Sequence, residues 1–209
     1  MKKILSLISV FAVVALSGCT CKSVETFKEA ADPTPLTEEA KAAWNGVEGM
    51  NVAWGTPDLV YSRSLVPQNT TCCYSTKGWR GEKVSAQVIL WTAKDLKSVE
   101  CEISDFKSAD AKLPSSIAEA RFVRYTLADK SDRNCRCARS NGHPAILQAD
   151  MLDNLEAMDV EANTVRPIWI TVAIPQDAKA GVYKAEVKVS HCGCGSVTLP
   201  LEVEVVNQV

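Results

Sequence analysis

The chain has 209 residues, which suits one sizeable domain or two small ones. Its formal net charge is −2, with 46% hydrophobic and 23% charged residues. This composition excludes wholesale disorder, and it lacks the basic excess that is typical of proteins that bind nucleic acid.

The first eighteen residues have the composition of an export signal. Two lysines precede the apolar run Ile4–Leu16, which is short for a membrane span. The run ends in LSGC, residues 16–19, which resembles the lipobox of bacterial lipoproteins. This resemblance implies cleavage before Cys19, lipidation of Cys19, and a protein anchored in the cell envelope, at the outer membrane. The alternative is an ordinary signal peptide followed by an incidental cysteine.

The segment after the signal predicts a tether and then a short helix. Residues 19–36 show no periodicity and contain two prolines, so we expect a tether between the lipid and a domain over residues 37–209. Residues 37–44 predict a helix, because Thr37 can cap its amino end and two glutamates follow in the first turn. Trp44 is expected to dock this helix on the domain.

The middle of the chain predicts short strands separated by turns. Residues 47–67 contain two extended runs around a turn at 55–58, and residues 68–78 are polar and turn-rich. Apolar alternation predicts strands over Lys83–Trp91 and Val99–Asp105, the first of them central because both its faces are apolar. Residues Ile117–Leu127 follow, with Phe122 and Tyr125 among arginines. We expect residues 129–152 to form a long loop and residues 151–162 to be short and mixed.

The clearest pattern lies in residues 166–206, where three successive segments alternate with a period of two. This period predicts half-buried antiparallel strands, each with one polar face. Their apolar faces need a second layer to cover them. With at least seven expected strands and almost no helix, the sequence predicts an all-β fold, an antiparallel immunoglobulin-like β-sandwich.

The cysteines predict disulfides rather than a metal site. Once Cys19 is assigned to the lipid, eight cysteines remain, and an even number in an exported chain is typical of disulfides. One arrangement would join the 135–137 loop to the 192–194 hairpin, although spacing leaves the connectivity open. Cys-x-Cys pairs fit structural zinc poorly, so we expect no metal and no cofactor. The candidate disulfide residues are Cys72, Cys73, Cys135, Cys137, Cys192 and Cys194.

Motifs for catalysis are weak, and sugar binding is the remaining chemical option. His143 and His191 have no accompanying nucleophile motif, so no catalytic residue is predicted. Exposed aromatic side chains can stack on sugar rings, and Trp54 and Trp79 are the candidates for this role. Packing in the core is the alternative for each large aromatic residue. Trp91 and Trp169 are further tryptophans of the domain.

Several motifs resemble the N-terminal domain of glycoside hydrolase family 123. They are AWGTPD at 53–58, WRGEKVSAQ at 79–87, FVRY at 122–125, DMLD at 150–153, RPIW at 166–169 and IPQDAKAGVY at 174–183. The resemblance begins at about Val47 and implies a β-sandwich that normally precedes a barrel-type catalytic domain. Enzymes of this family are similar to β-N-acetylgalactosaminidases, often lipoproteins of Bacteroidota, in which an adjacent Asp-Glu pair assists the substrate's acetamido group.

The catalytic features that the resemblance implies are not found in these residues. No Asp is followed by Glu, and the sequence ends at Val209, before the ~250 residues that a barrel typically needs. We therefore expect a lipid-anchored, non-catalytic accessory domain associated with glycan processing. Its expected partners are the membrane and either a glycoside hydrolase catalytic domain or a glycan. The alternatives are a stand-alone carbohydrate-binding or adhesin-like surface lipoprotein and the N-terminal fragment of a β-N-acetylgalactosaminidase.

Overall fold

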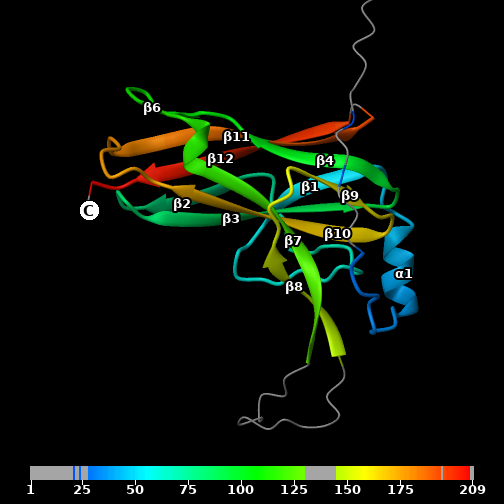
Figure 1. Ribbon diagram of the computed structural model, residues 1–209. Coiled ribbons are helices and arrows are strands. Elements are labelled where there is room, and N and C mark those ends of the chain that lie inside the picture. Colours follow the sequence, from blue (N-terminus) through cyan, green and yellow to red (C-terminus); the bar gives the residue numbers. More distant parts are fainter. Residues whose placement is uncertain (1–20, 22–23, 25–27, 130–144, 194, 208–209) are drawn as a thin grey trace, which may run out of the picture.

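The computed structural model describes residues 21, 24, 28–129, 145–193 and 195–207 (Figure 1). Two packed sheets form a sandwich, which confirms the predicted all-β fold class. Within the described residues, no helix has the length and apolar character needed to span a membrane. The elements in chain order are α1 (Glu38–Trp44), β1 (Met50–Gly55), β2 (Tyr74–Gly78), β3 (Lys83–Thr92), β4 (Leu96–Ile103), β5 (Phe106–Lys107), β6 (Lys112–Leu113), η1 (Ser115–Ile117), β7 (Ala118–Asp129), β8 (Ala145–Leu152), β9 (Ala157–Val160), β10 (Thr164–Ala173), β11 (Gly181–Cys192) and β12 (Ser196–Val205).

The first sheet has the strand order β1-β3-β10-β7-β8. Strand β3 lies between β1 and β10 and pairs with both in antiparallel register. Its residues Ala86 to Leu90 are buried without a break, because neighbours cover both of its faces. The prediction that this strand is central is therefore confirmed.

The second sheet has the order β2-β12-β11-β4-β9, and the short strands β5 and β6 extend it beside β11. Strands β11 and β12 form a hairpin in which Gly181 lies opposite Val205 and Ser190 opposite Ser196. Strand β2 runs parallel to β12, while the other strand pairs of the described residues are antiparallel. The turn-rich interpretation of residues 68–78 is thus wrong for 74–78. As an edge strand, β2 is covered on one side only, which weakens its apolar alternation.

Three further expectations about strands are wrong. Of the two extended runs expected in residues 47–67, only β1 is a strand. Residues 56–67 belong to the loop between β1 and β2, in which Tyr61 is buried. In the expected loop 129–152, residues 145–152 form β8 on the edge of the first sheet, and residues 130–144 lie outside the described part. In the expected mixed segment 151–162, residues 157–160 form β9.

The three strands of residues 166–206 do not share one sheet. Strand β10 belongs to the first sheet, whereas β11 and β12 belong to the second (Figure 1). The predicted inward face of β10 is confirmed, since Ile168, Ile170 and Val172 are almost fully buried. Alternation reports which side chains are buried, but it does not report which strand lies alongside.

The core fills the space between the two sheets. The ring of Trp54 in β1 is fully buried, and its Nε1 donates a hydrogen bond to the carbonyl oxygen of Pro200 in β12, at 2.9 Å. The same ring stacks on Tyr74, with 5.3 Å between ring centroids. Trp54 therefore ties the first sheet to the second at the level of a single side chain.

The short helix forms as the sequence predicts. The Thr37 hydroxyl caps α1 by accepting a hydrogen bond from the amide of Ala40, at 3.2 Å. Trp44 is buried at its other end, where Nε1 donates to the carbonyl oxygen of Ser64 at 2.9 Å. The predicted docking of the helix through Trp44 is thus confirmed.

The described residues between 21 and 36, which we call the strap, are bound to the sandwich. Cys21 forms a disulfide with Cys192, with Cα atoms 5.4 Å apart. Glu29 accepts hydrogen bonds from β7 and β10, and Asp32 accepts one from the Ser64 hydroxyl at 2.9 Å. The expected free tether is in its described part a segment held against the domain. Isolated polar contacts of this kind leave no periodic signal in the sequence.

Candidate functional site

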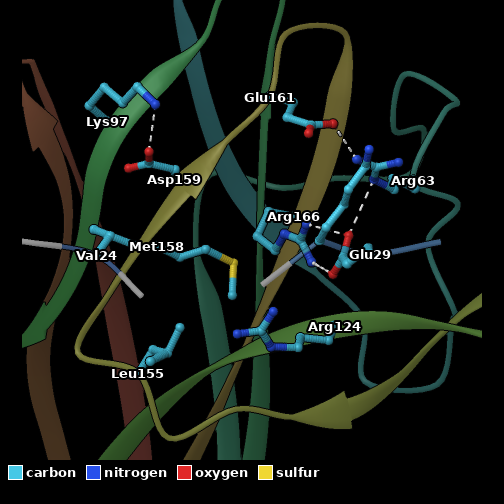
Figure 2. A pocket seen from close by; sticks show the side chains of 11 residues that line it. Val24, Glu29, Arg63, Lys97, Arg124, Leu155, Met158, Asp159, Glu161 and Arg166 are labelled. Carbon is cyan, nitrogen blue, oxygen red and sulfur yellow. Dashed lines mark hydrogen bonds and ion pairs between the residues drawn. The ribbon is translucent and has the colours of Figure 1, made fainter. Parts of the chain in front are cut away.

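A cavity of about 360 Å³ opens where the strap crosses the sandwich (Figure 2). Its wall combines strap residues with side chains from β4, β7, β9, β10 and the loop before β2. Cationic and acidic side chains dominate one side, and a few apolar side chains form the other. The lining residues are Val24, Lys28, Glu29, Arg63, Lys97, Arg124, Leu155, Met158, Asp159, Glu161 and Arg166.

Glu29 occupies the centre of the charged wall. Its two carboxylate oxygens accept hydrogen bonds from the two terminal nitrogens of Arg166, at 2.6 and 2.9 Å. The amide of Tyr125 donates to the same carboxylate at 3.0 Å, and Arg63 Nε lies 3.3 Å from Oε2. The Glu29 and Arg166 side chains are each 5% exposed. This is a buried, bidentate ion pair, the geometry in which Arg and carboxylate groups bind most strongly.

The surroundings of Glu29 keep it ionised. Burial by itself raises the pKa of a carboxyl group, because it removes water from the charged form. Here the hydrogen bonds and positive charge of Arg166, together with Tyr125 N–H and Arg63, outweigh burial and lower the pKa of Glu29 below its ordinary value. Arg166 is itself held by the Val123 carbonyl oxygen at 2.8 Å, and its guanidinium lies 5.2 Å from the centroid of the Tyr125 ring.

The other two carboxylates of the cavity are also paired. Glu161 accepts from Arg63 at 2.5 Å. Asp159 accepts from Lys97 Nζ at 2.6 Å and from the Ser98 amide at 2.9 Å. Burial raises the pKa of Asp159, but these two donors outweigh it and the net shift is downward. Glu29 and Asp159 are therefore both held in the charged form.

The arginine cluster was missed by the sequence predictions. Arg124 lies in β7 and pairs with Asp153 just after β8, and Arg166 lies in β10. Each arginine interrupts an apolar strand, and a charged residue that is buried in a strand needs a partner. That signal indicates a buried ion pair, but it does not identify Glu29 as the partner.

The tryptophan candidates for sugar stacking occupy different environments. Trp54 is fully buried between the sheets, so the prediction that it stacks on a sugar is wrong. Trp79 is 54% exposed in the turn between β2 and β3. Trp91 and Trp169 are half-buried. Exposure therefore leaves Trp79 as the candidate whose ring is open to a ligand.

A second hollow, of about 260 Å³, lies on the outer side of the first sheet and is mainly apolar. Exposed Leu59, Val60 and Leu152 border it, and Trp169 contributes to its floor. The side-chain amide of Gln87 donates to the Leu59 carbonyl oxygen at 3.2 Å, which fixes the loop that forms one wall. Its full lining is Pro57, Leu59, Val60, Gln87, Val123, Ala149, Asp150, Leu152 and Trp169.

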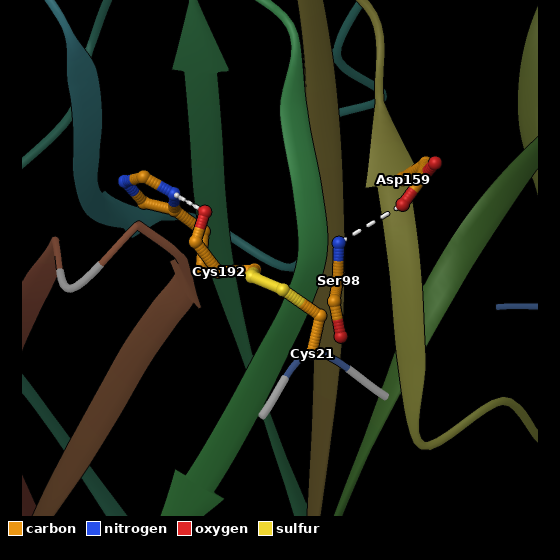
Figure 3. The surroundings of a disulfide bond; sticks show 5 residues. Cys21, Ser98, Asp159 and Cys192 are labelled. Carbon is orange, nitrogen blue, oxygen red and sulfur yellow. Dashed lines mark hydrogen bonds between the residues drawn. A yellow bond between two sulfur atoms is a disulfide. The ribbon is translucent and has the colours of Figure 1, made fainter. Parts of the chain in front are cut away.

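The disulfide at Cys192 differs from the one arrangement considered, which joined the 135–137 loop to the 192–194 hairpin. Cys192 pairs with Cys21 (Figure 3), and Cys72 and Cys73 are free, exposed thiols. Cys101 is also free, and burial raises its pKa to about 12, so its thiol is protonated at neutral pH. Among the described residues, no group of three or more His, Cys, Asp or Glu side chains is placed to hold a metal ion. The candidates Cys19, Cys135, Cys137 and Cys194, like His143, lie outside the described residues.

Comparison with known proteins assigns the family. The sequence-family model of the glycoside hydrolase 123 N-terminal domain matches residues 54–191. A family 123 glycoside hydrolase from Clostridium perfringens, described in a study of glycolipid glycan hydrolysis, aligns with a TM-score of 0.67 and 21% identity. The alignment covers 78% of this chain and 28% of the clostridial chain, so this chain spans about a quarter of that enzyme and shares its fold over that part.

Other comparisons add nothing to function. A PapD-like domain of human CEP192 aligns over 90% of this chain and 98% of its own, but at a TM-score of 0.32 and 11% identity it supports no argument. No curated protein matches the sequence. The family match agrees with the motifs from AWGTPD onward and with the observed sandwich fold. The chain belongs to the glycoside hydrolase 123 N-terminal domain family.

Proposed function

We propose that this protein is a lipid-anchored, non-catalytic β-sandwich domain that acts as an accessory module in glycan processing at the outer membrane. The family match supports the link to glycan processing, since it covers the sandwich itself. The protein partner in this proposal is a glycoside hydrolase catalytic domain, on the same chain or another. The lipobox-like LSGC motif supports the anchor, and the Cys21–Cys192 disulfide fits an oxidising compartment outside the cytoplasm.

The observation that carries the non-catalytic part is the pairing of the cavity carboxylates. Glycoside hydrolysis needs a carboxyl group that is protonated near neutral pH, and enzymes achieve this by raising its pKa. In the cavity beside the strap, the pKa values of the carboxyl groups are shifted downward. Arg166 lowers the pKa of Glu29 and Lys97 lowers that of Asp159, in each case against the effect of burial. Neither carboxyl group can serve as a general acid at pH 7.

A hydrolysis assay tests this part of the proposal. The exported chain from residue 21 onward is incubated with p-nitrophenyl β-N-acetylgalactosaminide, with the clostridial enzyme as the positive control. We expect no release of nitrophenol above the blank. Turnover that is abolished by Asp159→Asn would place a catalytic acid in the cavity and would contradict the non-catalytic assignment.

The anchor is tested separately by radiolabelled palmitate. We expect the full-length protein to incorporate the label and to fractionate with the outer membrane, and the Cys19→Ser variant to lose both properties. The variant Cys72→Ser, which removes an exposed free thiol, is the matched control and should keep the label. Label that survives Cys19→Ser would contradict the assignment of the lipid to that residue.

The exposure of Trp79 favours one second function, carbohydrate binding by the protein alone. An indole that is 54% exposed can stack on a pyranose ring. In that case a glycan array should show specific binding that Trp79→Ala removes and that Leu65→Ala, at an exposed apolar residue away from the Trp79 turn, leaves unchanged. An array without any bound glycan would exclude this function. The third possibility, an N-terminal fragment of a β-N-acetylgalactosaminidase, requires activity that appears only with an added catalytic domain.

A further inference from the structure

The disulfide ties the start of the strap to one end of the sandwich. Cys192 is the last residue of β11, and its neighbour across the sheet is Lys97 in β4. The turn between β3 and β4, which contains Lys94, lies at the same end. We call this region, defined by residues 93–97 and 191–193, the anchor end. Figure 3 shows the Cys21 side chain meeting Cys192 beside β4.

The opposite end of the sandwich carries different residues. Strand β11 begins there at Gly181, opposite Val205 near the end of β12. The turn with Trp79 and the β10–β11 connection with Lys179 lie at this end (Figure 1). We call this region, defined by residues 77–82 and 174–181, the far end. The eleven steps along β11 separate the two ends by about 35 Å.

The length of chain between Cys19 and Cys21 is short compared with that distance. Two residues span at most about 7 Å, whereas the eighteen residues of a free tether would reach roughly 60 Å. A free tether would let the domain turn in any direction relative to the bilayer. A disulfide two residues after a lipidated cysteine instead brings the anchor end to the level of the lipid headgroups.

We infer that the anchor end is a membrane-facing surface and that the Cys21–Cys192 disulfide orients the domain on the bilayer. The far end, with Trp79, then points away from the lipid, where a glycan or a partner can reach it. This inference rests on the proposed lipid anchor at Cys19. The ion pair of Glu29 with Arg166 is a second attachment, ten residues after Cys19. Without the disulfide, the chain between Cys19 and Glu29 could extend to about 35 Å.

Native lysines at the two ends allow a direct test by footprinting. The lipidated full-length protein is placed in vesicles of phosphatidylethanolamine and phosphatidylglycerol and treated with a membrane-impermeant acetylating reagent. Mass spectrometry compares Lys94 and Lys97 at the anchor end with Lys77 and Lys179 at the far end, all four of which are exposed. The chain from residue 21 onward, mixed with the same vesicles, gives the reference rates without an anchor.

We expect anchoring to slow acetylation of Lys94 and Lys97 several-fold and to leave Lys77 and Lys179 unchanged. In the double variant Cys21→Ser/Cys192→Ser, which retains Cys19, the acetylation rates of Lys94 and Lys97 relative to those of Lys77 and Lys179 should return toward the values of the unanchored chain. Reduction of the wild-type protein with a thiol gives the same comparison without substitutions.

The experiment distinguishes a failure of the proposed orientation from a failure of the proposed lipid anchor. Protein that floats with the vesicles but shows equal protection at both ends overturns the orientation alone. Protection at the anchor end that persists after loss of the disulfide contradicts the role of Cys21. Protein that does not float with the vesicles overturns the lipid anchor and the orientation together.

Discussion

Glu29 attaches the strap to the sandwich through a buried ion pair with Arg166. A buried ion pair is costly to desolvate, and its loss on one side leaves the other charge uncompensated. Arg166, which is 4% exposed, has no other carboxylate partner among the hydrogen bonds of the described residues. The pair therefore specifies where the strap lies.

The substitution Glu29→Gln should lower the free energy of unfolding by about 3 kcal/mol, because it leaves the Arg166 charge buried without a counter-charge. Urea denaturation of the exported chain measures the change. The control is Glu38→Gln, whose side chain is 85% exposed and pairs with Lys41 on the helix surface. It should change the stability by less than about 0.5 kcal/mol. Equal behaviour of the two variants would mean that the Glu29–Arg166 pair contributes no stability.

The same pair predicts a dependence on pH. The pKa of Glu29 is lower in the folded protein than its ordinary value of 4.5. Its contribution is therefore fully present above the unfolded-state pKa and is lost as the pH falls through the lower, folded-state pKa. The stability difference between wild type and Glu29→Gln should be constant from pH 7 to about 5.5 and should shrink below about pH 4.5. A difference that grows on acidification would contradict this assignment.

At the scale of elements, the strap extends a sandwich that the family match covers only from residue 54. The disulfide to β11, the Glu29 ion pairs with β10 and the loop before β2, and the hydrogen bond from Ser64 to Asp32 hold it. The strap also closes one side of the main cavity through Val24, Lys28 and Glu29 (Figure 2). An element without periodic sequence thus shapes the charged cavity that contains Glu29 and Arg166.

Loss of the disulfide should destabilise the protein. The Cys21–Cys192 bond joins positions 171 residues apart, and a cross-link over a long loop restricts the unfolded chain. We expect Cys21→Ser/Cys192→Ser to lose about 2–4 kcal/mol in urea denaturation while keeping the sandwich fold. Cys72→Ser/Cys73→Ser removes two exposed free thiols and serves as the control without an expected loss. Equal stability of the two double variants would show that the bond does not contribute.

At the scale of the whole molecule, a few side chains cross between the sheets and make them one unit. Trp54 is the largest of these, because its ring is fully buried and its indole nitrogen reaches the backbone of β12. Strand β2 adds to this linkage, since it lies in the second sheet while Thr71, three residues before it, is bridged to Trp54 in the first. The two sheets should therefore unfold together.

The variant Trp54→Phe should cost about 2 kcal/mol or more, because it leaves a cavity in the core and removes the donor for the Pro200 carbonyl oxygen. The transition in urea should remain a single step when followed by circular dichroism and fluorescence. Trp79→Phe makes the same chemical change at an exposed site and should be neutral within about 0.5 kcal/mol. A neutral Trp54→Phe would contradict the bridging role of this side chain.

The sequence predictions succeeded where burial follows the local backbone period. The central position of β3, the inward face of β10 and the capped helix with Trp44 could each be predicted, because they depend on residues close together in the chain. They failed for β2 and β8, which are edge strands with mixed polarity. For Trp54 they left core packing and sugar stacking both open, since composition does not distinguish a tryptophan in the core from one on the surface.

The sequence alone determined the fold class, the family resemblance and the faces that point inward. These depend on pleat geometry, which repeats every two residues, and on short motifs. Only the tertiary structure decided that β10 lies in the opposite sheet from β11 and β12, and that Glu29 meets Arg166 across 137 residues. Such pairings are set by packing and charge over the entire chain, so no local pattern records them. The charged cavity that they create could be found only in the folded molecule.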